Sequence, residues 1–137
     1  MNELSDELYN AIMHEMKEGD SAFEKDFFNS ALKHYEYAED LIPNPHTDWE
    51  IALHVYVALG DCYFNLENYE SANYCYNRAL LCPDGIGCGY VWLGLGESLY
   101  ELNRLEEAKD ALMRAYILEG EDIFEDEKYF DIIKEVI

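Results

Sequence analysis

Three carboxylates recur at the same spacing in this chain, and an aromatic side chain follows each of them three residues later. The carboxylates are Asp20, Asp61 and Glu97, and their aromatic companions are Phe23, Phe64 and Tyr100. A carboxylate forms ion pairs with Lys or Arg, and the face of an aromatic ring forms cation–π contacts with the same groups. The combination therefore indicates a surface that binds positively charged groups, not a catalytic centre.

Residue patterns typical of catalysis or metal binding are absent from the sequence. The cysteines are separated by 12, 6 and 5 residues and form no C-x-x-C pair, so we expect reduced, partly buried thiols. The four histidines show no metal-ligand spacing. The glycine-rich stretch 84–89 (DGIGCG) is too short and wrongly placed for a nucleotide-binding loop, and its glycines are better explained as ending a helix. We predict no enzyme activity, no catalytic residue, no cofactor and no metal site.

Composition and charge limit the class of partner. Nine Lys and Arg residues face 30 Asp and Glu residues, which gives a formal net charge of −21. Such a charge repels nucleic acid and anionic lipid and attracts cationic proteins. No apolar run is long enough to cross a membrane, and the first ten residues are acidic where a secretory signal would be basic. We expect one domain over 1–137, soluble and cytoplasmic, with no nucleic-acid, membrane or small-molecule partner.

A repeat organises most of the chain. Gly19, Gly60 and Gly96 each precede an alanine by 12 residues, an aromatic or leucine by 16, and a second alanine by 19. Each unit contains two apolar stripes at helical spacing, separated in the second and third units by polar turns at 65–68 and 102–104. Two antiparallel helices per unit follow from this pattern.

Glycine inside a helix costs about 1 kcal/mol relative to alanine, so its recurrence needs a reason. We expect Gly60 and Gly96 to admit the paired helix closely, with Ala72 and Ala108 as the small residues opposite them. Ser5 is expected to cap the first helix, and Thr47 with Glu50 reads as a capping box for the third.

These residues resemble the tetratricopeptide repeat (TPR). The second unit matches best, through Tyr56, Leu59, Gly60, Tyr63, Ala72, Tyr76 and Ala79, and the third supplies Trp92, Leu95, Gly96, Leu99, Ala108, Leu112 and Ala115. The first unit departs at Glu15 and Glu18, and the glycines are 41 and 36 residues apart where the family has about 34. We therefore expect longer connections at 43–50 and near 83–88. The resemblance implies an all-α solenoid of three TPR helix hairpins at about 12–45, 53–86 and 89–121, plus a C-terminal capping helix at about 122–137.

In such an array the first helix of each pair lines the concave face. The predicted concave stripe consists of Met13, Met16, Asp20, Phe23, Glu24, His54, Val57, Asp61, Phe64, Asn65, Tyr90, Leu93, Glu97, Tyr100 and Glu101. Some family members grip a terminal carboxylate with Lys, Arg and Asn on this face, but this stripe contains no Lys or Arg. We expect a basic, partly apolar segment of a partner instead. The alternative is that the carboxylates are only solvated and the aromatics only pack between repeats.

An acidic tail follows the repeats. Residues 119–137 contain eight carboxylates and two lysines. Such a run is either a soluble cap or a second contact surface for a cationic protein, for which Glu121, Asp122, Glu125 and Asp126 are the candidates.

Our first functional hypothesis is an acidic inhibitor that neutralises a basic toxin or effector, because this short TPR chain with its EGEDIFEDEKYF segment resembles proteins of bacterial toxin–immunity loci. The alternatives are a TPR chaperone of a secreted protein and a generic regulatory adaptor.

Overall fold

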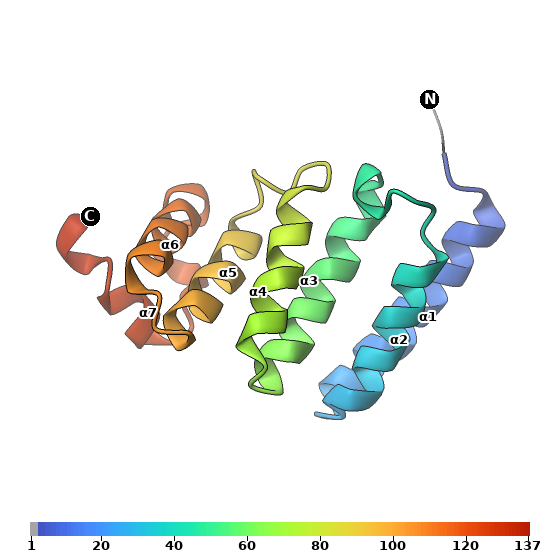
Figure 1. Ribbon diagram of the computed structural model, residues 1–137, viewed down its shortest axis with the longest axis horizontal. Helices are drawn as coiled ribbons and strands as arrows, with labels where there is room; N and C mark the ends of the chain where they lie inside the picture. Colours follow the sequence, from blue (N-terminus) through green and yellow to red (C-terminus); the bar gives the residue numbers. More distant parts are fainter. Residues whose placement is uncertain (1–2) are drawn as a thin grey trace.

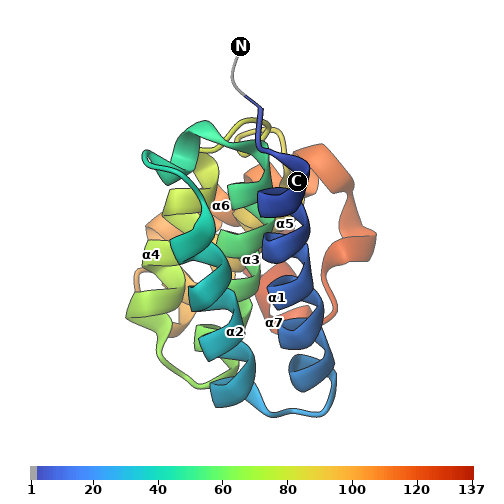
Figure 2. The same ribbon diagram turned by 90° about the vertical axis from the view of Figure 1, so that its right-hand side faces the viewer.

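The computed structural model describes residues 3–137, which form helices and turns without a strand. Three consecutive helix pairs make up the stack: α1 (Asp6–Glu24) with α2 (Phe28–Leu41), α3 (Glu50–Asn65) with α4 (Tyr69–Leu80), and α5 (Gly89–Glu101) with α6 (Leu105–Glu119). Figure 1 shows them side by side in chain order. The first helices α1, α3 and α5 form one layer and the second helices form the other (Figure 2). The predicted solenoid of helix hairpins is confirmed.

The two helices of every pair are joined by the same turn. Asp26, Glu67 and Asn103 occupy one repeat position in these turns, with left-handed φ angles of 62°, 61° and 61°. The next backbone N–H donates to a carbonyl five residues earlier, at 2.8 to 2.9 Å in the three turns. This pattern satisfies carbonyl groups that a helix end otherwise leaves unpaired. It confirms the polar turns predicted in the second and third units.

The repeated glycines do admit a close neighbour, but the neighbour is not the predicted alanine. A Cβ atom added at Gly60 would lie 2.7 Å from the ring of Tyr76, and one added at Gly96 would lie 2.6 Å from the side chain of Leu112. The residue 16 positions after the glycine therefore fills the space above it, because its long side chain crosses the first helix. Ala72 and Ala108 are also fully buried.

Gly60→Ala is expected to lower the free energy of unfolding by about 1 to 2 kcal/mol. The clash with the buried Tyr76 ring outweighs the better helix propensity of alanine. Gly87→Ala is the matched control, because a Cβ there would meet only the Asp84 carbonyl at 4.0 Å, and we expect a change within about 0.5 kcal/mol. Urea denaturation of both variants checks this prediction, and equal stability of the two would contradict it.

One of the two predicted caps is present. The Ser5 hydroxyl accepts a hydrogen bond from the Leu8 amide at 3.1 Å, as predicted. The capping box at Thr47 is wrong, because Thr47 lies in a 3-10 turn (His46–Asp48) and Trp49, in extended conformation, directly precedes α3. Trp49 packs against the core, so the helix starts after it and Thr47 is too far upstream to cap. The longer connections fall at 42–49 and 81–88, close to the predicted positions.

The C-terminal stretch is not the continuous helix predicted over 122–137. It consists of a 3-10 turn (Glu121–Ile123), the short helix α7 (Glu127–Asp131) and a second 3-10 turn (Lys134–Val136). Gly120, with φ of 86°, ends α6, and the extended backbone at Phe124 redirects the chain. The carboxylate of Asp126 then accepts from the Lys128 amide at 3.0 Å, so α7 begins only there. Phe130 and Ile133 are buried, whereas Ile137 is exposed.

Candidate functional site

An open groove of about 470 Å³ lies on the layer of first helices, between α1, α3 and the start of α5. Its lining comprises Met16, Asp20, Phe23, Tyr35, Leu53, His54, Val57, Ala58, Asp61, Cys88 and Tyr90. Seven of these belong to the predicted concave stripe. Among residues 3–137, no Lys or Arg lines the groove, and Asp20, Asp61 and His54 lie in a mainly apolar wall.

Both groove carboxylates are held by a tyrosine of the second helix. The Tyr35 hydroxyl donates to Asp20 Oδ1 at 2.6 Å, and the Tyr76 hydroxyl donates a short hydrogen bond to Asp61 Oδ1. Each tyrosine ring packs over the glycine that precedes its aspartate, so that its hydroxyl reaches the carboxylate. Holding the carboxylates in place reduces the ordering cost of binding a partner. They are therefore more than the freely solvated face of an amphipathic helix.

Sequence reasoning missed Tyr35 as a groove residue, although a signal for it existed. The pair Gly-Asp is followed 16 residues after the glycine by a tyrosine in the first and second units. Leu53, Ala58 and Cys88 were also missed, because small and apolar lining residues look the same as core residues in the sequence.

The third repeat lacks this arrangement. Leu112 stands where the other repeats have tyrosine, so Glu97 receives no hydrogen bond from that position. Burial, followed by the charges of Asp61, Asp126 and Glu125, raises the pKa of Glu97 to about 7. Burial also raises the pKa of Asp61 to about 6, while the hydrogen bond from Tyr76 opposes that shift. Part of the negative charge on this face is therefore lost between pH 8 and pH 5.

The aromatics beside the carboxylates pack in two different ways. Phe23 meets Phe28 edge to face at 5.1 Å, and Phe64 meets Tyr69 in the same manner at 5.2 Å. Each of these partners opens the second helix of the same repeat, so these rings brace their own hairpin. Tyr100 differs, since its edge-to-face partner at 5.2 Å is Tyr129 of α7.

The C-terminal stretch covers the third-repeat part of the predicted concave stripe. Phe64, Leu93 and Tyr100 pack against a cluster that contains Tyr129 and Phe130. Glu101, also predicted, contacts the same stretch through its side chain. The structure thus divides the predicted stripe into an open part, mostly over the first two repeats but including Tyr90, and a covered part, mostly over the third repeat but including Phe64.

The remaining predicted residues lie outside the open groove. Met13 and Glu24 are exposed on α1, and the Asn65 amide donates to the Asp61 carbonyl at 2.8 Å. The acidic-tail candidates are all exposed: Glu121, Asp122, Glu125 and Asp126. Asp126 also caps α7.

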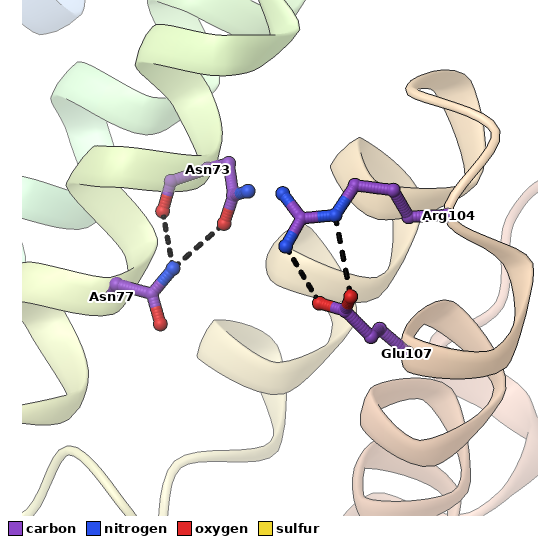
Figure 3. A network of polar contacts seen from close by, with 4 residues as sticks. All are labelled: Asn73, Asn77, Arg104 and Glu107. Atoms are coloured by element: carbon purple, nitrogen blue, oxygen red, sulfur yellow. Dashed lines mark hydrogen bonds and ion pairs between the residues drawn. The ribbon is translucent and has the colours of Figure 1, made fainter.

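The arginines lie on the layer opposite the groove. Arg78 of α4 stacks over the Tyr56 ring at 5.4 Å, and Arg114 of α6 stacks over Trp92 at 4.9 Å. Arg104 pairs with Glu107 at 2.7 Å at the start of α6, beside the hydrogen-bonded pair Asn73 and Asn77 of α4 (Figure 3). The three arginines therefore lie away from the groove.

Two further properties bear on the kind of site. Within residues 3–137, no group of three or more His, Cys, Asp and Glu side chains is arranged to hold a metal ion. Of the helices that the structure describes, none has the length and apolar character needed to span a bilayer.

Comparison with known proteins identifies the repeat. Residues 53–81 and 90–119, which lie in the second and third helix pairs, match the family model of the tetratricopeptide repeat. No curated protein matches the chain.

Solved structures share the whole architecture at low sequence identity. The TPR domain of Arabidopsis OM64 is 19% identical with a TM-score of 0.76, and the match covers 93% of this chain and 95% of that one. The Yersinia enterocolitica type III secretion translocator chaperone SycD is 18% identical with a TM-score of 0.75, covering 98% and 95%. The first TPR of Spaghetti (RPAP3), bound to the HSP90 peptide SRMEEVD, is 17% identical with a TM-score of 0.74, covering 92% and 90%. These likenesses establish the fold.

Proposed function

We propose that this protein is a non-enzymatic binding module that holds a basic, partly apolar segment of a partner protein in the groove. The observation that carries the proposal is the pair Asp20 and Asp61, fixed by tyrosines in an open groove whose described lining has no Lys or Arg. Lys or Arg side chains of the partner would pair with these carboxylates. Its apolar side chains would lie against Phe23, Val57 and Tyr90.

Structurally similar domains support a peptide as the occupant. The first TPR of Spaghetti (RPAP3) is bound to the HSP90 peptide SRMEEVD, and the second TPR domain of human RPAP3 is in complex with the HSP70 peptide SGPTIEEVD. Both peptides end in acidic residues. An anionic groove disfavours such ends, so we propose the opposite charge preference for this protein.

Within this proposal, the first role is that of an immunity-type inhibitor acting in the bacterial cytoplasm. A net charge of −21 accelerates association with a basic toxin or effector. The second role is a chaperone of a secreted protein, favoured by the apolar groove wall and by the shared fold with SycD. A regulatory adaptor is the default if neither role applies.

The groove is tested with a fluorescein-labelled peptide that alternates Arg and Leu, and with a matched peptide in which Glu replaces Arg. The double variant Asp20→Asn, Asp61→Asn keeps the acceptors for the tyrosine hydroxyls and removes both charges. We expect it to bind the Arg–Leu peptide about tenfold more weakly, or about 1.4 kcal/mol, since these pairs are partly desolvated. Fluorescence anisotropy measures this change.

The control variant Glu106→Gln, Asp110→Asn removes two exposed charges of α6 and should change the affinity less than about twofold. Binding of the wild type should weaken as salt rises. Equal binding of the Glu peptide, or an unchanged affinity of the aspartate double variant, would overturn the proposed groove.

The two roles are separated with the product of the adjacent reading frame as the probe. An inhibitor should bind that protein in its folded form, with an affinity that falls steeply as salt rises. A chaperone should bind an extended segment of it with little salt dependence.

A further inference from the structure

The segment formed by residues 125–137, called the terminal segment below, lies on the groove side of the stack. Its helix α7 lies against α5, a first helix, whereas the contacts of α3 and of α5 with the preceding repeat are mainly with its second helix. Figure 2 shows this segment on the same side as α1, α3 and α5. The terminal segment therefore does not simply continue the stack, and it covers part of the concave face.

A lysine and a tyrosine make the polar contacts of this segment with α5. The Tyr129 hydroxyl donates to Glu101 Oε2 at 2.7 Å, and Lys128 Nζ lies 2.9 Å from the same oxygen. The Lys128 ammonium also lies 5.7 Å from the centroid of the Tyr100 ring and 5.0 Å from that of Tyr129. The Lys128 ammonium and the Tyr129 ring thus contact a carboxylate and an aromatic ring of the predicted concave stripe.

The third repeat lacks an aromatic residue that the first two repeats have, and Tyr129 of the terminal segment takes its place. The second helices of the first two repeats begin with Phe28 and Tyr69, but Leu105 takes the corresponding position in the third. Tyr100 therefore has no aromatic partner at that position of its own hairpin, and Tyr129, only 5% exposed, supplies one. The surface around Tyr100 and Glu101 is complementary to a basic residue followed by an aromatic one.

The segment is also poorly matched to the surface in one respect. It brings Glu125 and Asp126 towards Glu97, and their charges help to raise the pKa of that carboxyl. Its single ion pair with α5 involves a lysine side chain that is 46% exposed, so that pair contributes little. Like-charge repulsion and a solvated ion pair make the segment easier to displace than a fully apolar cap.

We propose that the terminal segment is an internal ligand of the covered part of the predicted concave stripe, and that a partner segment with Lys or Arg followed by an aromatic residue replaces it on Tyr100 and Glu101. This inference rests on the proposed function and extends it. It names the partner's sequence chemistry for the third repeat. If the inference holds, the part of the concave face that is open to a partner depends on whether the terminal segment is bound to α5. Intramolecular attachment gives the segment an effective concentration in the millimolar range, so a free peptide competes poorly until the segment is weakened.

The test uses the full-length chain with Lys128→Glu, which replaces the ion pair with Glu101 by a repulsion. Lys134→Glu is the matched control, because this substitution makes the same change in charge. Lys134 Nζ lies 2.9 Å from Asp131 of the same segment, so the control breaks a pair within the segment and not a pair with α5. Hydrogen exchange of amides 127–133 should accelerate at least about tenfold in Lys128→Glu and less than about threefold in Lys134→Glu. Tyr129→Phe, which keeps the buried ring and removes its hydrogen bond to Glu101, should accelerate exchange in the same amides.

Binding is measured with a fluorescein-labelled peptide that contains Lys-Tyr-Phe between Gly-Ser flanks. Lys128→Glu should bind it at least about fivefold more tightly than the wild type or Lys134→Glu. Unchanged exchange in both Lys128→Glu and Tyr129→Phe, or accelerated exchange without any gain in affinity, would overturn the inference. If the Arg–Leu peptide still binds through Asp20 and Asp61 in that case, the proposed function stands and only the internal ligand fails. If neither peptide binds any variant, both fail.

Discussion

Tyr76→Ala is expected to lower the free energy of unfolding by about 4 kcal/mol, a large part of the stability of a domain of this size. Tyr76 is only 2% exposed, and its ring fills the space above Gly60 of α3 and Gly94 of α5. It therefore links the second repeat to the third as well as the two helices of its own hairpin. The substitution also removes the hydroxyl that donates to Asp61 and leaves a partly buried carboxylate without that partner.

Two companion variants separate the contribution of the Tyr76 ring from that of its hydroxyl. Stability is measured by urea denaturation followed by circular dichroism. Tyr76→Phe keeps the ring and loses only the hydrogen bond, so we expect a loss of about 1 to 2 kcal/mol. Tyr74→Ala removes a tyrosine of the same helix that is 64% exposed and should change stability by less than about 0.5 kcal/mol. If Tyr76→Ala proves as stable as Tyr74→Ala, the tyrosine does not hold the repeats together as described.

Glu97→Gln is expected to raise the free energy of unfolding by roughly 2 kcal/mol at pH 8.5 and to change it little at pH 4. Burial and nearby carboxylates raise the pKa of Glu97 from its ordinary 4.5 to about 7 in the folded protein. Between these two values the folded state binds more protons than the unfolded state, so wild-type stability falls as pH rises through this window. Glutamine carries no charge and removes that cost.

The measurement is the difference in unfolding free energy between Glu97→Gln and wild type at several pH values. Asp61, whose pKa is raised to about 6, titrates in both proteins, but its charge also raises the pKa of Glu97, so its contribution cancels only in part. Glu101→Gln should have the opposite sign at pH 8.5. Burial works against ionisation of Glu101, but the contacts with Tyr129 and Lys128 outweigh burial and lower its pKa. A pH-independent difference for Glu97→Gln, or the same sign for both variants, would contradict this account of the third repeat.

The hairpins and the concave side were predictable from sequence because both follow from local spacing. The offsets from Gly19, Gly60 and Gly96 indicate three helix pairs, and intervals of three and four place Asp20, Asp61 and their neighbours on one face. The turn positions followed from the polar residues between the apolar stripes. Each of these features depends on residues within one repeat.

The tyrosine contacts were harder to predict, because they depend on how closely two helices approach. Gly60 indicated a close neighbour, but only the helix geometry shows that the neighbour is the Tyr76 ring and that its hydroxyl reaches Asp61. Helical periodicity predicts that a side chain is buried, but it does not predict the direction in which a long side chain crosses the adjacent helix.

The path of the terminal segment was not predictable from periodicity either. Its apolar residues fit a helix over 122–137, but the structure breaks that helix and places Tyr129 against Tyr100. The relevant signals were Leu105 and Leu112, which depart from the first two units and leave the third repeat short of aromatic partners. Their consequence involves residues far apart in the sequence, so it appears only in the assembled fold.

The central claim is that the groove over Asp20 and Asp61 binds basic, partly apolar segments, and backbone NMR of the ¹⁵N-labelled protein tests it most directly. On titration with the Arg–Leu peptide, we predict that the shifted amides cluster at Asp20, His54, Asp61 and Tyr90, which line the groove. Shifts confined to α2, α4 and α6, or the same groove shifts with the Glu peptide, would contradict the claim.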